Sequence, residues 1–462
     1  MNSFSGTFEY LDPAGSVIRS GACSLTIDGA DFRLIPETGP ALAMDLGDID
    51  IFSPGDYRIS LKLYTGNSIV LSRLGKTFQN LCREFQEAYH RRLLQCLLLE
   101  DLEEIGRFDG FIQLDLSGDG FSGPAQLRIC RSNLVILPDT TRGLHWRLSD
   151  IESIDFDEAA YRLELRSGTG RIIITKLAKR TREFMECLKS AIHDLSENKA
   201  VILHSLFPFL SPDQFMGLTG LMKEGHAIQV SRMEAVHPRI KPVLIEKTVC
   251  GSMKPYFDFL EKRLAVKGDF FTGFKMIRPE GQNDTAGGGS NEISGSGNEG
   301  TVPEEPEEEN NAASDAGREE SDDSQPQVLH WFLFPLSTKP DPKVSANVAV
   351  WEATSHSGRA TYFFRILPGV TNDRVTDPAK TGDTVESSIQ RLNSALVLLN
   401  FRREPIYLPD DVLASQLSYR RYAIACRNLP VLRELRASYI GRAIHTTPEE
   451  WEKQAGDILA RA

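Results

Sequence analysis

Residues 25–36 read LTIDGADFRLIP, and residues 127–138 read LRICRSNLVILP. The two stretches match at a constant spacing of 102 residues, which continues to Asp48-Ile49 and Asp150-Ile151. Beyond that point the spacing shifts by a residue or two at expected turns, and Tyr57-Arg58 corresponds to Tyr161-Arg162. Shifts confined to turns are typical of a duplicated fold. The sequence therefore predicts two copies of one structural unit.

Each copy combines short strand-like runs with one closing helix. Apolar residues recur at every second position at 57–63 and 69–71 in the first copy, and the second copy repeats the plan with strand-like runs at 162–165 and 171–175. This period of two predicts antiparallel strands joined by turns. After Thr77 and Thr181 the apolar residues recur every three or four positions, which predicts an amphipathic helix at the end of each unit.

This strand order, the repeated Asp-Ile pair, the glycine turns and the final helix resemble the pleckstrin-homology-like superfold, in particular its bacterial members and the related GRAM-type domains. The resemblance covers roughly residues 1–198. It implies a strongly bent, seven-stranded sheet with one open end plugged by the helix. It also implies a binding module more often than an enzyme.

The first closing helix is expected to run from Thr77 to Asp101, which is longer than the sheet of one unit requires. Its second half is apolar on nearly all sides. The interpretation that we favour is that this half packs between the two units, and the alternative is an exposed docking surface for a partner. The expected interdomain packing residues are Leu93, Leu94, Leu97 and Leu98.

The rest of the chain predicts an α+β domain. Strand-like runs precede and follow a glycine-, serine- and glutamate-rich stretch, which is expected to be a disordered insertion within that domain. The last eighty residues show mainly helical patterns. The predicted fold is α+β, with these parts: 1–104 and 105–198, the two pleckstrin-homology-like units; 199–280 and 328–380, the α+β domain; 281–327, the acidic insertion; 381–462, a helical C-terminal region.

The net charge of −12 is located almost entirely in the insertion. Residues 281–327 contain thirteen acidic residues and one basic residue, which leaves 51 of each sign in the remainder of the chain. Any partner that binds through charge must therefore recognise a local charged patch on the folded domains. Seven scattered cysteines and no long apolar span favour a soluble cytoplasmic protein with reduced thiols and no membrane insertion.

No motif predicts a cofactor, a metal site or a catalytic centre. Residues 118–123, GDGFSG, spell a dinucleotide-binding pattern, but a strand rather than a helix is expected to follow them. Phosphoinositide binding is not expected, because the first hairpin offers only Arg19 in one copy and Asp115 and Asp119 in the other.

The clearest charged patch is a group of arginines interspersed with tyrosines near the C-terminus. Arginine and tyrosine together suit phosphate contacts and base stacking, although helical arginines also pair within a fold. The tentative anion-binding residues are Arg420, Arg421, Arg427, Arg433, Arg436 and Arg442.

From these observations we expect a non-enzymatic cytosolic scaffold or adaptor that binds protein partners through its tandem units. The alternative is an anion-binding or nucleic-acid-binding module that uses the arginines and is modulated by the acidic insertion. Double pleckstrin-like units beside acidic tracts also resemble histone chaperones. Nucleic acid is the less favoured partner, and a hydrolase in the C-terminal domain is a third hypothesis.

Overall fold

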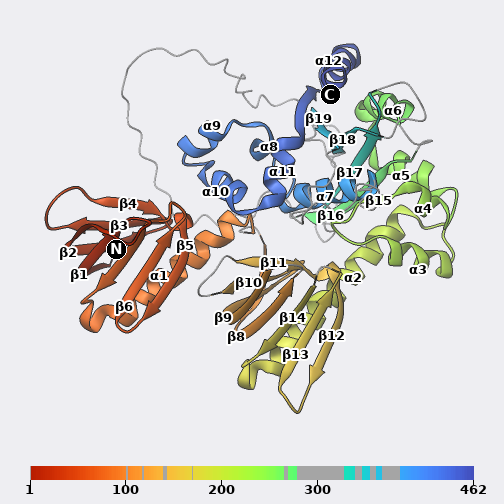
Figure 1. The fold of residues 1–462 in the computed structure, drawn as a ribbon. Coiled ribbons are helices and arrows are strands. Elements are labelled where there is room, and N and C mark those ends of the chain that lie inside the picture. The colour runs from red at the N-terminus through yellow and green to blue at the C-terminus, as the bar shows by residue number, and fades with distance from the viewer. Residues whose placement is uncertain are drawn as a thin grey trace, which may run out of the picture.

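The computed structural model describes residues 2–99, 102–116, 119–138, 143–168, 170–264, 269–277, 327–338, 346–353, 360–366 and 385–462. Within them the chain forms two seven-stranded sheets and one six-stranded sheet, together with α-helices (Figure 1), so the α+β class is confirmed. The acidic insertion predicted at 281–327 lies outside the described residues except for Gln327.

The first unit is one antiparallel sheet in the order β4-β3-β2-β1-β7-β6-β5. Its hydrophobic core contains Phe32, Phe52 and Leu61 from the strands, and Leu81 and Phe85 from the helix α1, which covers one face. Its elements are β1 (Ser3–Leu11), β2 (Val17–Asp28), β3 (Asp31–Pro36), β4 (Leu42–Asp45), β5 (Ile49–Gly55), β6 (Arg58–Leu63), β7 (Ser68–Ser72) and α1 (Phe78–Cys96).

The second unit repeats this topology strand for strand, in the order β11-β10-β9-β8-β14-β13-β12. The backbone repeats as well, because corresponding residues have a positive φ: Tyr57 and Tyr161, and Gly75 and Ala178. Its elements are β8 (Glu104–Leu116), β9 (Asp119–Cys130), β10 (Asn133–Pro138), β11 (Leu144–Arg147), β12 (Ile151–Asp157), β13 (Arg162–Ser167), β14 (Gly170–Thr175) and α2 (Thr181–Leu206).

The repeated position at Gly75 and Ala178 yields a matched pair of predictions. Ala178 has a φ of 51° where Gly75 has 56°, and a side chain in this left-handed region costs about 1–2 kcal/mol. Glycine loses more entropy on folding, which offsets about half of that cost. We expect Ala178→Gly to raise the free energy of unfolding by about 0.5–1 kcal/mol. Gly75→Ala should lower it by a similar amount, which chemical denaturation of both variants can measure.

The duplicated strands β3 and β10 differ in burial. In β3 buried and exposed residues alternate, whereas every residue of β10 is buried. Leu134 and Ile136 face the core of the second unit, while Val135 and Leu137 join the cluster that contains the end of α1. Because β10 is buried on both faces, its sequence NLVILP lacks the alternation of DFRLIP.

The first helix is shorter than the sequence predicted. It ends at Cys96 rather than near Asp101, because Leu98 adopts a left-handed φ of 59° that stops the helix. The turn separates the expected packing residues. Leu93 and Leu97 lie in the cluster with Val135 and Leu137, Leu98 lies in a core of the third domain, and Leu94 is partly buried.

The burial of Leu98 in the third domain can be tested by truncation. Leu98 is 4 % exposed, so Leu98→Ala should lower the free energy of unfolding by about 2–5 kcal/mol. Leu94→Ala, at the partly buried neighbour, is the control and should cost less. Equal losses for both variants in urea denaturation would contradict this assignment.

The second helix, not the first, is the long connection between domains. The 26-residue α2 packs Phe184, Leu188 and Leu195 into the second unit and then Ile202 and Leu203 into the third domain. A continuous helix shared by two cores makes the second unit and the third domain one body.

The third domain is an antiparallel sheet in the order β15-β16-β17-β18-β19-β20 with helices on both faces. The strands β16 and β17 pair from Phe271–Leu333 to Ile277–Gln327, so the segment between them joins two adjacent strands. The strands are β15 (Ile228–Gln229), β16 (Phe271–Ile277), β17 (Gln327–Leu336), β18 (Val348–Ala353), β19 (Ala360–Arg365) and β20 (Tyr439–Ile444).

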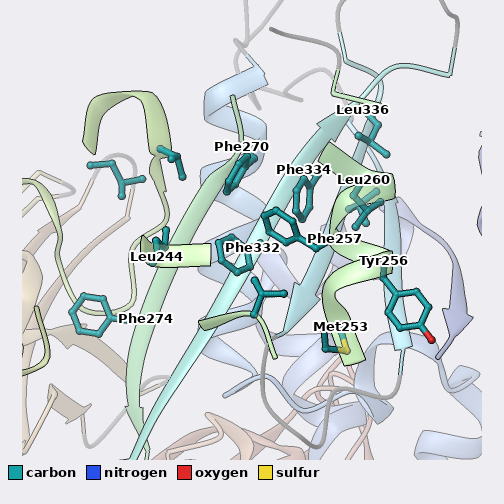
Figure 2. Close-up of a cluster of buried hydrophobic side chains, with 14 of the residues drawn as sticks. Leu244, Met253, Tyr256, Phe257, Leu260, Phe270, Phe274, Phe332, Phe334 and Leu336 are labelled. Carbon is teal, nitrogen blue, oxygen red and sulfur yellow. The ribbon is translucent and has the colours of Figure 1, made fainter. Parts of the chain in front are cut away.

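Alternate residues of β17 face the two helical layers. Figure 2 shows Phe332 and Phe334 on the same side as Phe257 of α6, whose ring centroid lies 5.1 and 5.2 Å from theirs. Trp331 and Leu333 belong to the core on the opposite face. Besides the end of α2, the first layer contains α3 (Pro212–Leu221), α4 (Val230–Glu234), α5 (Ile240–Thr248), α6 (Lys254–Lys262) and α12 (Pro448–Arg461).

The helices of the other layer come from the region predicted as helical, 381–462. They are α7 (Val385–Leu398), α8 (Glu404–Tyr407), α9 (Asp410–Ser415), α10 (Arg420–Asn428) and α11 (Pro430–Ser438). This region also contains one strand, β20, which was not predicted and which pairs with β19 at the edge of the third sheet. The run Tyr439–Ile444 contains aromatic and β-branched residues that suit a strand.

Candidate functional site at the domain junction

The predicted arginines do not form one patch. Arg420, Arg421 and Arg427 lie on α10, Arg433 and Arg436 on α11, and Arg442 on β20. Arg436 donates to the carbonyl oxygen of Leu408 (2.8 Å) and to Asp410 Oδ1 (2.6 Å). The Arg442 guanidinium lies 4.1 Å from the centre of the Tyr407 ring. Arg436 and Arg442 therefore make contacts within the third domain.

Arg420 and Arg427 instead converge on one carboxylate of the first unit. Arg420 Nη2 donates to Asp48 Oδ2 at 3.0 Å, and both Arg427 Nη atoms donate to Asp48 Oδ1 at 3.1 Å. Arg427 Nη2 also donates to the carbonyl oxygen of Gly47 at 3.1 Å. Asp48 belongs to the one-turn 3-10 helix Leu46–Asp48, which we call the first corner. The first corner thus attaches the first unit to α10.

A buried ion pair lies directly beside the first corner. Arg92 of α1 donates to Asp45 through Nε (2.7 Å) and Nη2 (2.5 Å), and the two side chains are 9 % and 4 % exposed. Burial alone would lower the pKa of Arg92, but the hydrogen bond and charge of Asp45 outweigh it and raise the pKa. Asp45 Oδ1 also accepts the backbone N–H of Gly47 at 2.7 Å, which fixes the corner. This pair keeps α1 and the first corner together.

The corner packs tightly against α10 at Gly47. A Cβ atom on Gly47 would lie 2.8 Å from Ile424 Cδ1 and 2.9 Å from Cys96 Sγ. We therefore expect Gly47→Ala to lower the free energy of unfolding by about 1–3 kcal/mol through overpacking. Gly55→Ala is the control, because a Cβ there has no atom within 4 Å. Urea denaturation of the two variants checks this, and equal stability would contradict the close contact.

The second unit uses the equivalent corner, Leu148–Asp150, to contact a different part of the third domain. Asp150 Oδ1 lies 2.5 Å from His226 Nε2, and its Oδ2 accepts Arg147 Nε at 2.9 Å. Arg147 Nη1 donates to the carbonyl oxygen of Gly225 at 2.8 Å. Burial alone would raise the pKa of Asp150, but His226 and Arg147 lower it to about 2. Asp48 and Asp150 are thus equivalent anchors.

The repeat of Asp48-Ile49 and Asp150-Ile151 is visible in the sequence, but it does not by itself predict the role of these residues. The 102-residue spacing was the signal for an equivalent position, but the partners lie far along the chain. Asp48 and Arg420, for example, are 372 residues apart. The repeat could therefore indicate the two anchors but not what they hold.

A buried polar cluster in the third domain was also missed. Thr361 Oγ1 donates to Glu352 Oε2 at 2.5 Å, His445 Nε2 lies 3.3 Å from the same oxygen, and Trp451 Nε1 donates to Thr361 Oγ1 at 2.9 Å. Burial raises the pKa of Glu352 above its usual range. These contacts connect β18 and β19 to α12 and to the residue that follows β20.

Two further findings bear on the class of site. Within the described part of the chain, no three histidine, cysteine, aspartate or glutamate side chains come together as metal ligands. Nor does any described helix combine the length and apolar composition needed to cross a bilayer.

Comparison of the chain with models of protein families and with curated proteins found no match. The function must therefore be inferred from the arrangement of the chain's own residues.

Proposed function

We propose that the chain is a non-enzymatic scaffold in which two pleckstrin-homology-like units bind protein partners. Two features support this proposal. Each unit has the seven strands and single closing helix that the resemblance implies. Each unit is also attached to the third domain by its corner, which leaves the equivalent hairpins, β5–β6 and β12–β13, at the far ends of the units (Figure 1).

The observation that carries the proposal is a tyrosine repeated at these two hairpins. Tyr57 is 73 % and Tyr161 66 % exposed, and both have a positive φ, 56° and 47°. Asp56 and Tyr57 form a two-residue hairpin turn in which both residues have positive φ, a position that favours Asn-Gly. Strained, exposed residues of this kind cluster at binding sites. We infer that the two tyrosines contact the partner.

The test replaces both tyrosines by glycine, which the backbone conformation favours. The double variant Tyr57→Gly/Tyr161→Gly should remain folded, because the strain that glycine relieves offsets the loss of the ring contacts of Tyr57 with Phe78 and of Tyr161 with Phe156. It should nevertheless lose the proteins that the unchanged full chain captures from its source cells, as measured by quantitative mass spectrometry. Leu417→Ala, at a side chain that is 86 % exposed, is the control. Capture of the same proteins by the double variant would refute the role of the tyrosines.

A further inference from the structure

Two arginines of α10 hold a single anionic group at the surface. Arg420 and Arg427 are seven residues apart on the helix, so their side chains leave the same face two turns apart. Together they donate three N–H groups to the two oxygens of Asp48. The side chains of Arg420 and Arg427 remain 37 % and 39 % exposed, and that of Asp48 is 29 % exposed. Solvent therefore reaches this site.

More positive charge surrounds Asp48 than one carboxylate neutralises. The neighbouring carboxylate of Asp45 is already held by Arg92, although Arg420 Nε also lies 3.5 Å from it. Arg433 donates Nη1 to the carbonyl oxygen of Arg427 at 2.7 Å and adds a further positive charge. A phosphate monoester carries about −1.5 to −2 charges and three acceptor oxygens, so it complements this site better than a carboxylate does.

We propose that Arg420 and Arg427 form a receptor for a phosphorylated serine or threonine in a partner protein, and that Asp48 occupies this receptor in the resting chain. The assignment rests on the proposed function in so far as the partner is a protein. Convergence of both arginines on one anionic group favours a single phosphate monoester. A nucleic-acid strand would instead need a row of basic side chains along its backbone.

The tethered Asp48 competes with the ligand. Because it belongs to the same chain, its effective concentration at the arginines is in the millimolar range or above, which weakens binding of an external phosphate. Removal of the Asp48 carboxylate leaves two guanidinium groups without this partner. The hydrogen bond from Arg427 Nη2 to the carbonyl oxygen of Gly47 does not involve the Asp48 carboxylate and remains to hold the first corner in place.

The experiment measures fluorescence anisotropy of a labelled phosphoserine peptide, and of the same peptide without phosphate, with the full chain. Asp48→Ala should bind the phosphopeptide at least ~10-fold more tightly than the unchanged chain. Asp48→Ala/Arg427→Ala should lose this gain. Glu37→Gln, at an exposed acidic residue of the same unit, is the control and should bind as the unchanged chain does. If Asp48→Ala does not fold, Asp48→Asn takes its place.

Two results would overturn the proposal. Equal affinity of Asp48→Ala for the two peptides would show that the arginines serve only to attach the first unit. Equal or tighter binding of a single-stranded oligothymidylate would show a general polyanion site rather than a phosphopeptide receptor. Neither result depends on Tyr57 or Tyr161, so failure of the scaffold proposal in the capture experiment is distinguishable from failure here.

Discussion

Replacement of Arg92 by leucine is expected to lower the free energy of unfolding by about 3–5 kcal/mol, because it leaves Asp45 charged, buried and without its main partner. Asp45 keeps the backbone N–H of Gly47 and a longer contact of 3.5 Å to Arg420 Nε, and these compensate for only part of the loss. Urea denaturation at neutral pH measures the change.

A double-mutant cycle separates the ion pair from other effects. In Asp45→Leu/Arg92→Leu both charges are removed, so the loss should be smaller than the sum of the two single losses. Arg131→Leu provides the control, because the Arg131–Glu103 pair is on the surface, with side chains 69 % and 35 % exposed. Surface pairs contribute only about 0–1 kcal/mol. If Arg92→Leu costs no more than Arg131→Leu, the buried pair does not stabilise the junction.

The duplication could be predicted from the sequence because its signals are local. Alternation and turn residues mark most strands of each unit, and the constant spacing aligns the two copies even at the corners. The register of these strands follows from which face is buried, which the alternation also encodes. The α+β class follows from the same patterns.

The end of α1 could not be predicted in this way. Residues 93–99 are good helix formers, and nothing in their order marks a stop. The chain turns at Leu98 because Leu97 and Leu98 pack into different cores, and this is a tertiary requirement. The length of α2, in contrast, could have been inferred from the sequence, although the second unit was predicted to end at 198, inside this helix. No glycine or proline interrupts 181–206, and Ile202 and Leu203 continue its apolar stripe up to Pro208.

The role of the arginines could not be predicted from the sequence, for a related reason. A run of arginines on helices has the same sequence pattern whether it binds a ligand, faces solvent or pairs within the fold. The structure assigns Arg420 and Arg427 to Asp48, in a different unit of the chain. An electrostatic contact between distant segments leaves no local periodicity from which it could be inferred.

Acidification is expected to destabilise the protein between about pH 6.5 and pH 4, because three histidines are held neutral in the folded state. The pKa of His90 is lowered to about 4, first by burial and then by the charges of Arg128 and Arg107, against an opposing hydrogen bond from Gln126. Burial likewise lowers the pKa values of His145 and His330 to about 4.

The direction of this change in stability follows from proton binding. Between about pH 6.5 and pH 4 the unfolded chain binds protons at these histidines and the folded chain does not, so stability is lost as the pH falls through this window and stops changing below it. For His90, which is 2 % exposed, the loss is roughly 2–3 kcal/mol between about pH 7 and pH 4.5. Below about pH 4 the lowered pKa of Asp150 adds a separate loss, because its carboxylate becomes protonated.

The variant His90→Gln isolates this contribution, since glutamine does not titrate. Between about pH 7 and pH 4.5, the free energy of unfolding of this variant should fall by roughly 2–3 kcal/mol less than that of the unchanged chain. Urea denaturation at the two pH values measures both changes. His193→Gln, at a side chain that is 68 % exposed, is the control and should follow the unchanged chain. His90 lies on α1 of the first unit, and the charges of Arg107 and Arg128 in the second unit act on it. The result therefore also reports on the contact between the two units. Parallel pH curves for His90→Gln and the unchanged chain would mean that His90 is protonated without cost, and hence that water reaches it between the two units.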